Sequence, residues 1–217
     1  MNEFILLGHA KNYVPVIFDI IEDIYGPSHF TIYHNIDEIE TPDIFLNEVN
    51  YKYTLFDRLA IPQAADNVLF GVNGPKAKNA VYHYFSKVIN RANFIRLVHP
   101  TSYVSKSAQI MQGVIIEPNC TISSQSIINF GVNLKRNVSV GHHVELCAFS
   151  EINPGVVISG NVKVGNNSII GSGTVIKDGI SIGENSLIGM GSVVTRDIPS
   201  GVIAYGNPCK VIRENVK

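Results

Sequence analysis

Excess charge and long apolar runs are both missing from this chain. Its 217 residues carry 17 Lys and Arg against 18 Asp and Glu, so the formal net charge is −1. Balanced charge gives no bulk attraction to nucleic acid or to a membrane surface. No segment approaches the roughly 18 apolar residues of a membrane-spanning helix, and residues 1–7 lack the basic region and cleavage signal of a secretory leader. We therefore expect a cytoplasmic protein without nucleic-acid or membrane partners.

Cysteine is scarce as well. The three residues, Cys120, Cys147 and Cys209, are odd in number and widely spaced. This pattern favours small core side chains in a reducing compartment over a disulfide framework or a metal site. Cys147 has no base at a suitable spacing, so we expect no cysteine acyl-enzyme.

A strict repeat fills the C-terminal half. A period of six fits neither a helix, at about 3.6 residues per turn, nor a strand, whose side chains alternate with a period of two. It is typical of a hexapeptide β-helix, in which three short strands make one coil, and it predicts about five coils. Each of the sixteen positions is Ile, Leu or Val, and none is skipped: Val104, Ile110, Ile116, Ile122, Ile128, Leu134, Val140, Leu146, Ile152, Ile158, Val164, Ile170, Ile176, Ile182, Ile188 and Val194.

The other positions of the repeat agree with this interpretation. Four residues after each aliphatic position the side chain is mostly small or β-branched, which predicts a second inward position. Turn positions carry residues that tolerate positive φ, namely Asn119, Asn137, Asn161, Asn166, Asn167, Asp178 and Asn185. A β-sandwich is the alternative, but it does not produce an unbroken period.

The first 98 residues have a different pattern. Strands are expected at residues 4–7, 30–33, 68–72 and 94–98, with helices at 14–24 and about 76–90, while the pattern at 37–58 is weak. Alternating strands and helices predict a small parallel α/β domain of Rossmann-like type over 1–98, followed by a β-helix domain with a C-terminal cap over 99–217. The first strand ends at Gly8, but G-x-G-x-x-G is absent, so a nucleotide site and an ordinary turn both remain open there.

After the last repeat, residues 197–212 read Asp-Ile-Pro-Ser-Gly-Val-Ile-Ala-Tyr-Gly-Asn-Pro-Cys-Lys-Val-Ile and leave the period of six. With the α/β unit and the repeat, this segment resembles the bacterial sugar acetyltransferases grouped with sialic acid O-acetyltransferase and UDP-4-amino-sugar N-acetyltransferase. The resemblance implies a left-handed parallel β-helix and an acetyl-CoA-dependent homotrimer. It also implies a nucleotide-sugar acceptor in the N-terminal domain, with acetyl-CoA between neighbouring subunits.

The catalytic motif of that family is a His followed by Asp or Glu, some eight residues before Phe-Ser/Ala-His-x-x-x-Gly. The resemblance places His142 at the catalytic position, as general base. The chain departs from the motif twice, because His143 replaces the carboxylate and Glu151 replaces the later histidine. Glu145 or Glu151 is the expected substitute carboxylate, since both end a hexad, and we expect them to share one face of the β-helix.

The two adjacent histidines have other interpretations. A zinc site like that of β-helix carbonic anhydrases needs three histidines, whereas only His142 and His143 lie in the repeat, so we expect no metal. Two exposed turn histidines without a catalytic role are the remaining alternative.

The resemblance also implies binding residues. For acetyl-CoA they are Glu151, Gly155, Gly160, Ser172, Gly173, Met190 and, against the phosphates, Lys210. For the acceptor they are Gly8, Ala10, Lys11, Asn12, Asn73 and Gly74.

The predicted activity is acetyl transfer from acetyl-CoA to an amino or hydroxyl group of a sugar or nucleotide-activated sugar, with a backbone N–H stabilising the oxyanion. Two alternatives remain: O-acetylation of sialic acid or another free sugar, and a non-catalytic sugar-nucleotide-binding scaffold.

Overall fold

The computed structural model describes residues 2–34, 50–55 and 66–216. The chain divides into two compact units, Met1–Leu97 and Val98–Lys217. Most of the segment 37–58, whose sequence pattern is weak, lies outside the described residues.

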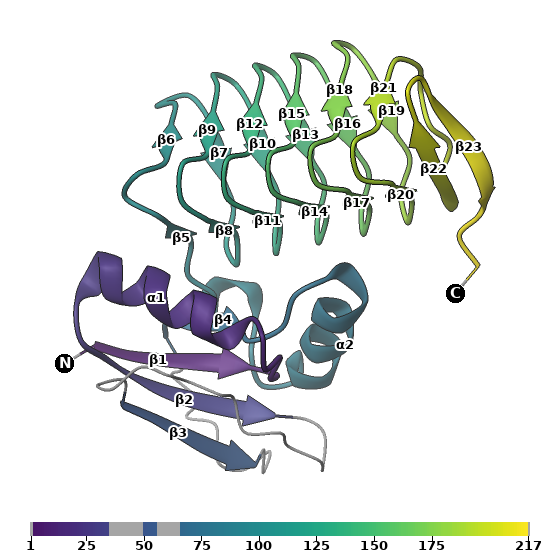
Figure 1. Ribbon diagram of the computed structural model, residues 1–217. Helices are drawn as coiled ribbons and strands as arrows, with labels where there is room; N and C mark the ends of the chain where they lie inside the picture. The colour runs from purple at the N-terminus through teal and green to yellow at the C-terminus, as the bar shows by residue number, and fades with distance from the viewer. Residues whose placement is uncertain (1, 35–49, 56–65, 217) are drawn as a thin grey trace. The chain divides into compact units, whose positions relative to one another are not determined.

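The N-terminal unit is built on a parallel sheet of order β3-β2-β1-β4 (Figure 1). Its strands are β1 (Asn2–Leu7), β2 (Ser28–His34), β3 (Asn50–Leu55) and β4 (Val68–Phe70), and its helices are α1 (Val14–Tyr25), α2 (Pro75–Phe85) and the short 3-10 turn η1 (Arg91–Asn93). The prediction of a small parallel α/β unit is confirmed.

Helix α1 packs because its apolar residues recur every three or four positions. Val14, Ile17, Phe18 and Ile21 are buried, and the rings of Phe18 and Phe30 lie 4.0 Å apart. Helix formation ends at Gly26, whose φ of 72° is in the left-handed region.

Two predicted bounds in this unit are wrong. Helix α2 ends at Phe85 rather than near residue 90, because the N–H groups of Val88 and Ile89 both donate to the Phe85 carbonyl and turn the chain. This turn still buries Ile89. In place of a strand over 94–98 there is one bridge between Val68 and Phe94, followed by β5 (Leu97–Val98).

The C-terminal unit is a parallel β-helix, and sixteen two-residue strands end on the sixteen aliphatic positions. Successive strands belong to successive sheets, so three strands make a coil of eighteen residues. The six-stranded sheet contains β6 (Tyr103–Val104), β9 (Thr121–Ile122), β12 (Ser139–Val140), β15 (Val157–Ile158), β18 (Val175–Ile176) and β21 (Val193–Val194). The five-stranded sheet contains β7 (Gln109–Ile110), β10 (Ile127–Ile128), β13 (Glu145–Leu146), β16 (Lys163–Val164) and β19 (Ser181–Ile182).

The third sheet has eight strands and includes the C-terminal cap. Strand β22 pairs in parallel with β20, and β23 pairs antiparallel with β22, so a hairpin continues the sheet beyond the last coil. The strands are β5, β8 (Ile115–Ile116), β11 (Asn133–Leu134), β14 (Glu151–Ile152), β17 (Ile169–Ile170), β20 (Leu187–Ile188), β22 (Val202–Gly206) and β23 (Cys209–Glu214).

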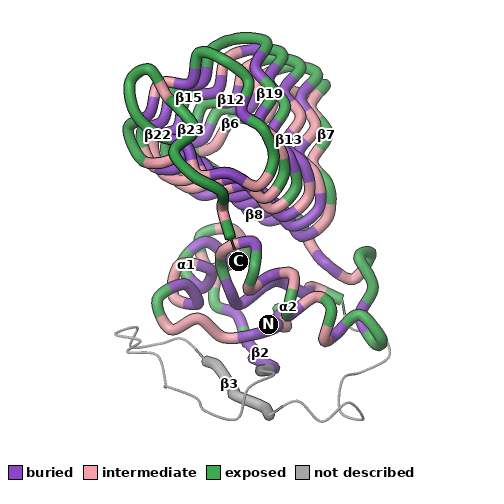
Figure 2. The backbone as a smooth tube through the Cα atoms, turned by 90° about the vertical axis from the view of Figure 1, so that its right-hand side faces the viewer, coloured by how far each residue is buried: buried purple, intermediate pink, exposed green. Residues whose placement is uncertain are grey.

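Two columns of inward side chains form the core of the β-helix. Figure 2 gives a view along the β-helix, in which buried residues recur in the stacked coils. The aliphatic positions from Ile116 to Val194 are buried. The second predicted inward position is buried from Val114 onward, and most of its hydroxyl groups donate to corner carbonyls, as Ser126 Oγ does to Gly141 O at 2.8 Å and Ser168 Oγ to Gly183 O at 2.7 Å.

The corners depend on a left-handed residue in every hexad. Positive φ recurs every six residues from Gly113 to Gly191 without a break, at Gly, at five Asn and at Gln125, His143 and Phe149. Asn166 and Asp178, which the sequence analysis placed among the positive-φ residues, do not adopt it, since the left-handed position is the next residue.

Candidate functional site

His142 and His143 lie at a corner that joins the six-stranded to the five-stranded sheet, between β12 and β13. Residues 141–144, 159–162 and 177–180 stack there on successive coils, and we name them the His142 corner. Both imidazoles are exposed, and their Nδ1 atoms lie 3.1 Å apart. One Nδ1 must donate and the other accept. With the proton on His142 Nδ1, the Nε2 of His142 carries the lone pair that a general base needs.

Gly160 lies directly against the His142 ring, one coil further along. A Cβ added at Gly160 would be 2.5 Å from Cε1 and 2.6 Å from Nε2 of His142, so any side chain at this position would force the ring to move. The N–H of Asn161 donates to the carbonyl of His142 at 2.8 Å and fixes the two coils at this point. Gly160 was predicted to contact acetyl-CoA, and the structure shows that its missing side chain makes room for the imidazole.

Asp178, two coils beyond His142, reaches the same point. The added Cβ at Gly160 would also be 2.7 Å from Oδ2 of Asp178, so this carboxylate and the His142 ring converge above one glycine. The side-chain amide of Asn161 donates to Asp178 at 3.4 Å. Sequence reasoning treated Asp178 only as a turn residue. The spacing of eighteen residues between positions 142, 160 and 178 could have indicated this contact, because three hexads make one coil and residues one coil apart stack on each other.

The two carboxylates that were expected to support His142 lie elsewhere. Glu145 is in β13 of the five-stranded sheet, whereas Glu151 is in β14 of the eight-stranded sheet, so the expectation that they share a face is wrong. Residues one hexad apart lie on neighbouring faces of the β-helix, and only residues three hexads apart lie on the same face. Glu145 Oε2 is 2.8 Å from Lys163 Nζ, and Glu151 Oε1 is 3.1 Å from Lys135 Nζ.

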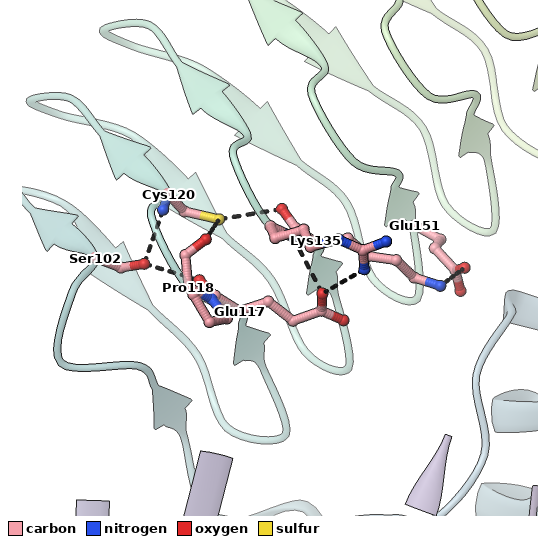
Figure 3. Close-up of polar contacts among 7 residues, drawn as sticks. Ser102, Glu117, Pro118, Cys120, Lys135 and Glu151 are labelled. Atoms are coloured by element: carbon pink, nitrogen blue, oxygen red, sulfur yellow. Dashed lines mark hydrogen bonds and ion pairs between the residues drawn. The ribbon is translucent and has the colours of Figure 1, made fainter. Parts of the chain in front are cut away.

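Glu151 belongs to a buried polar cluster with a structural role (Figure 3). Its neighbour Glu117 is buried, accepts the N–H of Arg136 at 3.1 Å and has a pKa raised mainly by burial. The thiol of Cys120 donates to the Lys135 carbonyl at 3.1 Å, and burial raises the pKa of Cys120 to about 11. These groups hold consecutive coils together, because each interaction joins residues of neighbouring coils.

Cys147 is unsuited to attack a thioester. Its Sγ faces Glu145 Oε1 at 3.7 Å, and burial, followed by the Glu145 charge, raises the pKa of the Cys147 thiol. The thiolate, which is the reactive form, is therefore disfavoured.

A second corner carries most of the residues that were predicted to bind acetyl-CoA. Residues 153–156, 171–174 and 189–192 join the eight-stranded to the six-stranded sheet, and we name them the Met190 corner. Ser172 and Met190 line a groove of about 250 Å³ together with Asn153 and Leu187, and the side chain of Met190 is 79% exposed. Gly155 and Gly173 occupy the left-handed position of this corner, and Gly173 faces open space.

The other two predicted cofactor residues lie apart from this groove. Glu151 is in β14 and is paired with Lys135, and Lys210 is exposed in β23. A larger groove of about 860 Å³ follows the five-stranded sheet and was not anticipated. It is lined by Glu145, Cys147, Lys163, Ser181 and Ser200, among others.

The predicted acceptor residues meet at one edge of the N-terminal sheet. The order β3-β2-β1-β4 reverses direction between β1 and β4, and open parallel sheets bind ligands outside the carboxyl ends of their strands at such a point. The Ala10 N–H donates to the Gly71 carbonyl at 2.8 Å, which joins the two loops. Gly8 and Ala10 to Asn12 follow β1, and Asn73 and Gly74 follow β4.

Gly8 is required by packing. Its φ is 77°, and an added Cβ would be 2.8 Å from both Val72 Cγ1 and Val81 Cγ2. Lys11 is half-buried, and Asn12 and Asn73 are exposed, so polar groups are available at this edge.

Within residues 2–34, 50–55 and 66–216, no three His, Cys, Asp or Glu side chains are grouped closely enough to hold a metal ion. In the same part of the chain, no helix combines the length and the apolar character needed to cross a membrane.

Comparison with known families gives a direct match in the repeat. Residues 113–142 match the family described as the hexapeptide repeat of succinyl-transferase. Residues 143–178 and 161–196 match the family described as bacterial transferase hexapeptide (six repeats). The chain carries the hexapeptide repeat of bacterial transferases. A relative from Mesorhizobium japonicum, acyl-[acyl-carrier-protein]–UDP-N-acetylglucosamine O-acyltransferase, is 40% identical over 57 residues, which are 26% of this chain and 20% of that enzyme.

Solved structures share the whole fold. A single-substitution mutant of perosamine N-acetyltransferase from Caulobacter crescentus, in complex with CoA and GDP-perosamine, has a TM-score of 0.81 at 20% identity, over 99% of this chain and 98% of that one. The acetyltransferase domain of PglB from Neisseria gonorrhoeae FA1090, in complex with acetyl coenzyme A, has a TM-score of 0.80 at 24% identity, over 98% and 100%. WeeI from Acinetobacter baumannii AYE has a TM-score of 0.77 at 19% identity, over 97% and 100%. The resemblance to bacterial sugar acetyltransferases is thus confirmed for both units of the fold.

Proposed function

We propose that this protein is an acetyl-CoA-dependent acetyltransferase whose acceptor is an amino group, or a hydroxyl group, of a nucleotide-activated sugar. The exposed imidazole of His142 at a β-helix corner is the observation that carries the proposal. The shared fold supports it, because a structure of similar fold contains CoA together with GDP-perosamine.

The reaction needs one base. His142 Nε2 takes the proton of the attacking nitrogen or oxygen as that atom bonds to the acetyl carbon. The C–S bond then breaks, and the sulfur of CoA takes up the proton. No covalent enzyme intermediate forms, in agreement with the protonated Cys147 thiol. A backbone N–H of a corner is the expected donor to the tetrahedral oxyanion.

The two corners suggest why more than one copy is needed. In a single chain the six-stranded sheet separates the His142 corner from the Met190 corner. The outward side chains of this sheet are uncharged throughout: Tyr103, Thr121, Ser139, Val157, Val175 and Val193. Val157 and Val175 are 42% and 41% exposed. A neighbouring copy packed along this sheet would place its Met190 corner beside His142, which supports a homotrimer with acetyl-CoA between subunits.

The acceptor is assigned to the switch point between β1 and β4. Loops 8–13 and 71–74 converge there and present Lys11, Asn12 and Asn73. The absence of G-x-G-x-x-G is compatible with a sugar nucleotide that is held by fewer backbone contacts than a dinucleotide.

The test is CoA release, with the acetylated product identified by mass spectrometry. The full chain is incubated with acetyl-CoA and, separately, UDP- and GDP-linked amino sugars, free amino sugars and sialic acid. Turnover with a nucleotide-linked amino sugar supports the proposal. Turnover with free sugars alone would establish the O-acetylating alternative, and no turnover with any acceptor would favour the non-catalytic scaffold.

A further inference from the structure

The His142 corner contains a carboxylate that the motif does not predict. His143 occupies the position where the related enzymes carry Asp or Glu, and an imidazole cannot act as an anion there. Glu145 and Glu151 are not substitutes, because the Glu145 carboxylate is paired with Lys163 and the Glu151 carboxylate is paired with Lys135, in the eight-stranded sheet. The side-chain carboxylate that meets the His142 ring above Gly160 is that of Asp178.

We infer that Asp178 is the positioning residue of this site: its carboxylate stabilises the protonated imidazole of His142 that forms during acetyl transfer. The inference rests on the proposed function. Asp178 Oδ2 and His142 Nε2 both lie close to the position of an added Cβ at Gly160, at 2.7 and 2.6 Å, so the two atoms are at most about 5 Å apart. No hydrogen bond joins Asp178 to His142 among the contacts of the described chain, so the effect acts through space.

The negative charge of the Asp178 carboxylate favours the protonated form of the His142 ring. When Nε2 accepts the acceptor's proton, the ring becomes positive beside an anion, which lowers the free energy of that state. His143 is the other titratable group against the ring, at 3.1 Å, and it adds no negative charge.

Other charged groups near this corner are Lys177, which precedes Asp178, and Arg196, which takes the same position one coil further. Neither lies within ion-pair distance of Asp178 in residues 66–216. The side-chain amide of Asn161 donates to both carboxylate oxygens of Asp178 at 3.4 Å and so holds the carboxylate in place.

The first experiment does not depend on turnover. The full chain is labelled at histidine Cε1, and the His142 resonance is assigned by its loss in His142→Asn. In Asp178→Asn, the titration midpoint of this resonance should move to lower pH by roughly 0.5 unit, the size expected for a solvent-screened charge at about 5 Å. Glu214→Gln removes the same charge from an exposed position of β23 and should leave the midpoint in place. An unmoved midpoint in Asp178→Asn overturns the inference.

The second experiment uses the acceptor that the wild-type chain turns over. For Asp178→Asn we expect kcat to fall roughly three- to tenfold, and the rise of kcat with pH to shift to lower pH. The KM values for both substrates should stay within about twofold, and Asp178→Glu should recover part of kcat. A raised acceptor KM with an unmoved pH profile would show instead that Asp178 binds the acceptor, and would overturn the inference. If the wild-type chain releases no CoA with any acceptor, the proposed function fails, while the resonance of His142 still decides the role of Asp178.

Discussion

The His142 corner and the Met190 corner share one backbone arrangement but carry different side chains. Both stack the same position of successive coils, and both use a left-handed residue in every hexad. The His142 corner gathers the titratable groups His142, His143 and Asp178, and two of them, His142 and Asp178, meet above Gly160. The Met190 corner gathers Gly155, Gly173 and an open groove. The repeat thus fixes the scaffold through its inward columns and leaves the corners free to differ: one carries titratable side chains, and the other carries glycines and a groove.

Removal of the His142 imidazole should have the largest effect, and it should change kcat rather than the KM for acetyl-CoA. In His142→Asn we expect kcat to fall by roughly 10² to 10⁴, the usual contribution of a general base, with the KM for acetyl-CoA within about twofold. His83→Asn changes an exposed histidine of α2 and serves as the control. Steady-state kinetics check both variants, and a kcat within threefold of wild type in His142→Asn would remove His142 from the chemistry.

Gly160→Ala tests whether the ring needs the space below it. The new methyl group would lie 2.5 Å from His142 Cε1, so the ring and Asp178 must move, and we expect kcat to fall roughly 10- to 100-fold. Gly201→Ala is the control, since it has a strained φ of 69° but no atom within 4 Å. Equal losses of kcat in the two variants would mean that a general disturbance of the β-helix, and not the position of the ring, is responsible.

Substitutions at the Met190 corner should change the KM for acetyl-CoA. Ser172→Trp fills the groove of about 250 Å³, and we expect the KM for acetyl-CoA to rise roughly tenfold with kcat nearly unchanged. Ser172→Ala removes the hydroxyl group without filling the groove and should have a smaller effect. Initial rates at varied acetyl-CoA check this, and an unchanged KM in Ser172→Trp would exclude the groove from cofactor binding.

Glu145→Gln should change little. This carboxylate pairs with the exposed Lys163, and pairs of this kind contribute about 0–1 kcal/mol to stability. We expect kcat and its pH profile to stay within twofold of wild type. A shift of the profile comparable to that of Asp178→Asn would restore Glu145 as the partner of His142.

The thiols of Cys120 and Cys147 should react slowly near neutral pH. The raised pKa values of Cys120, about 11, and of Cys147 keep both thiols protonated, so alkylation by iodoacetamide should be slow at pH 7 and accelerate as pH rises. Mass spectrometry of the intact chain follows the reaction. Cys147→Ala should keep full activity, and its inactivation would point to an acyl-enzyme.

The β-helix could be predicted from the sequence, because the aliphatic residue in each hexad indicates a buried position even when the residues that pack against it are unknown. The sequence was also sufficient for the order of elements around β1 and β4, where hydrophobic runs and glycines mark the strands and turns. Partners across coils were harder. Asp178 is 36 residues from His142 in the sequence, whereas Glu145 and Glu151 follow His142 closely and were therefore the predicted carboxylates. The same eighteen-residue coil that excludes those two residues would have led to Asp178.

Ile89 and Phe94 show a second limit. Their apolar character suggested a longer helix and a strand, respectively, because burial and secondary structure are not separable in a short apolar segment. Both side chains are buried, but in a turn and at a single bridge.

Mixing two chains that are impaired at different corners tests most directly whether the His142 corner and the Met190 corner have separate roles. His142→Asn keeps the Met190 corner, and Ser172→Trp keeps the His142 corner. The two variants are co-expressed, the hybrid oligomer is purified with two different tags, and CoA release is measured at acetyl-CoA well below the KM of Ser172→Trp. If His142 of one copy acts on acetyl-CoA held by the Met190 corner of its neighbour, the hybrid will be clearly more active than the sum of the two separate variants. A hybrid rate equal to that sum would contradict a site shared between copies.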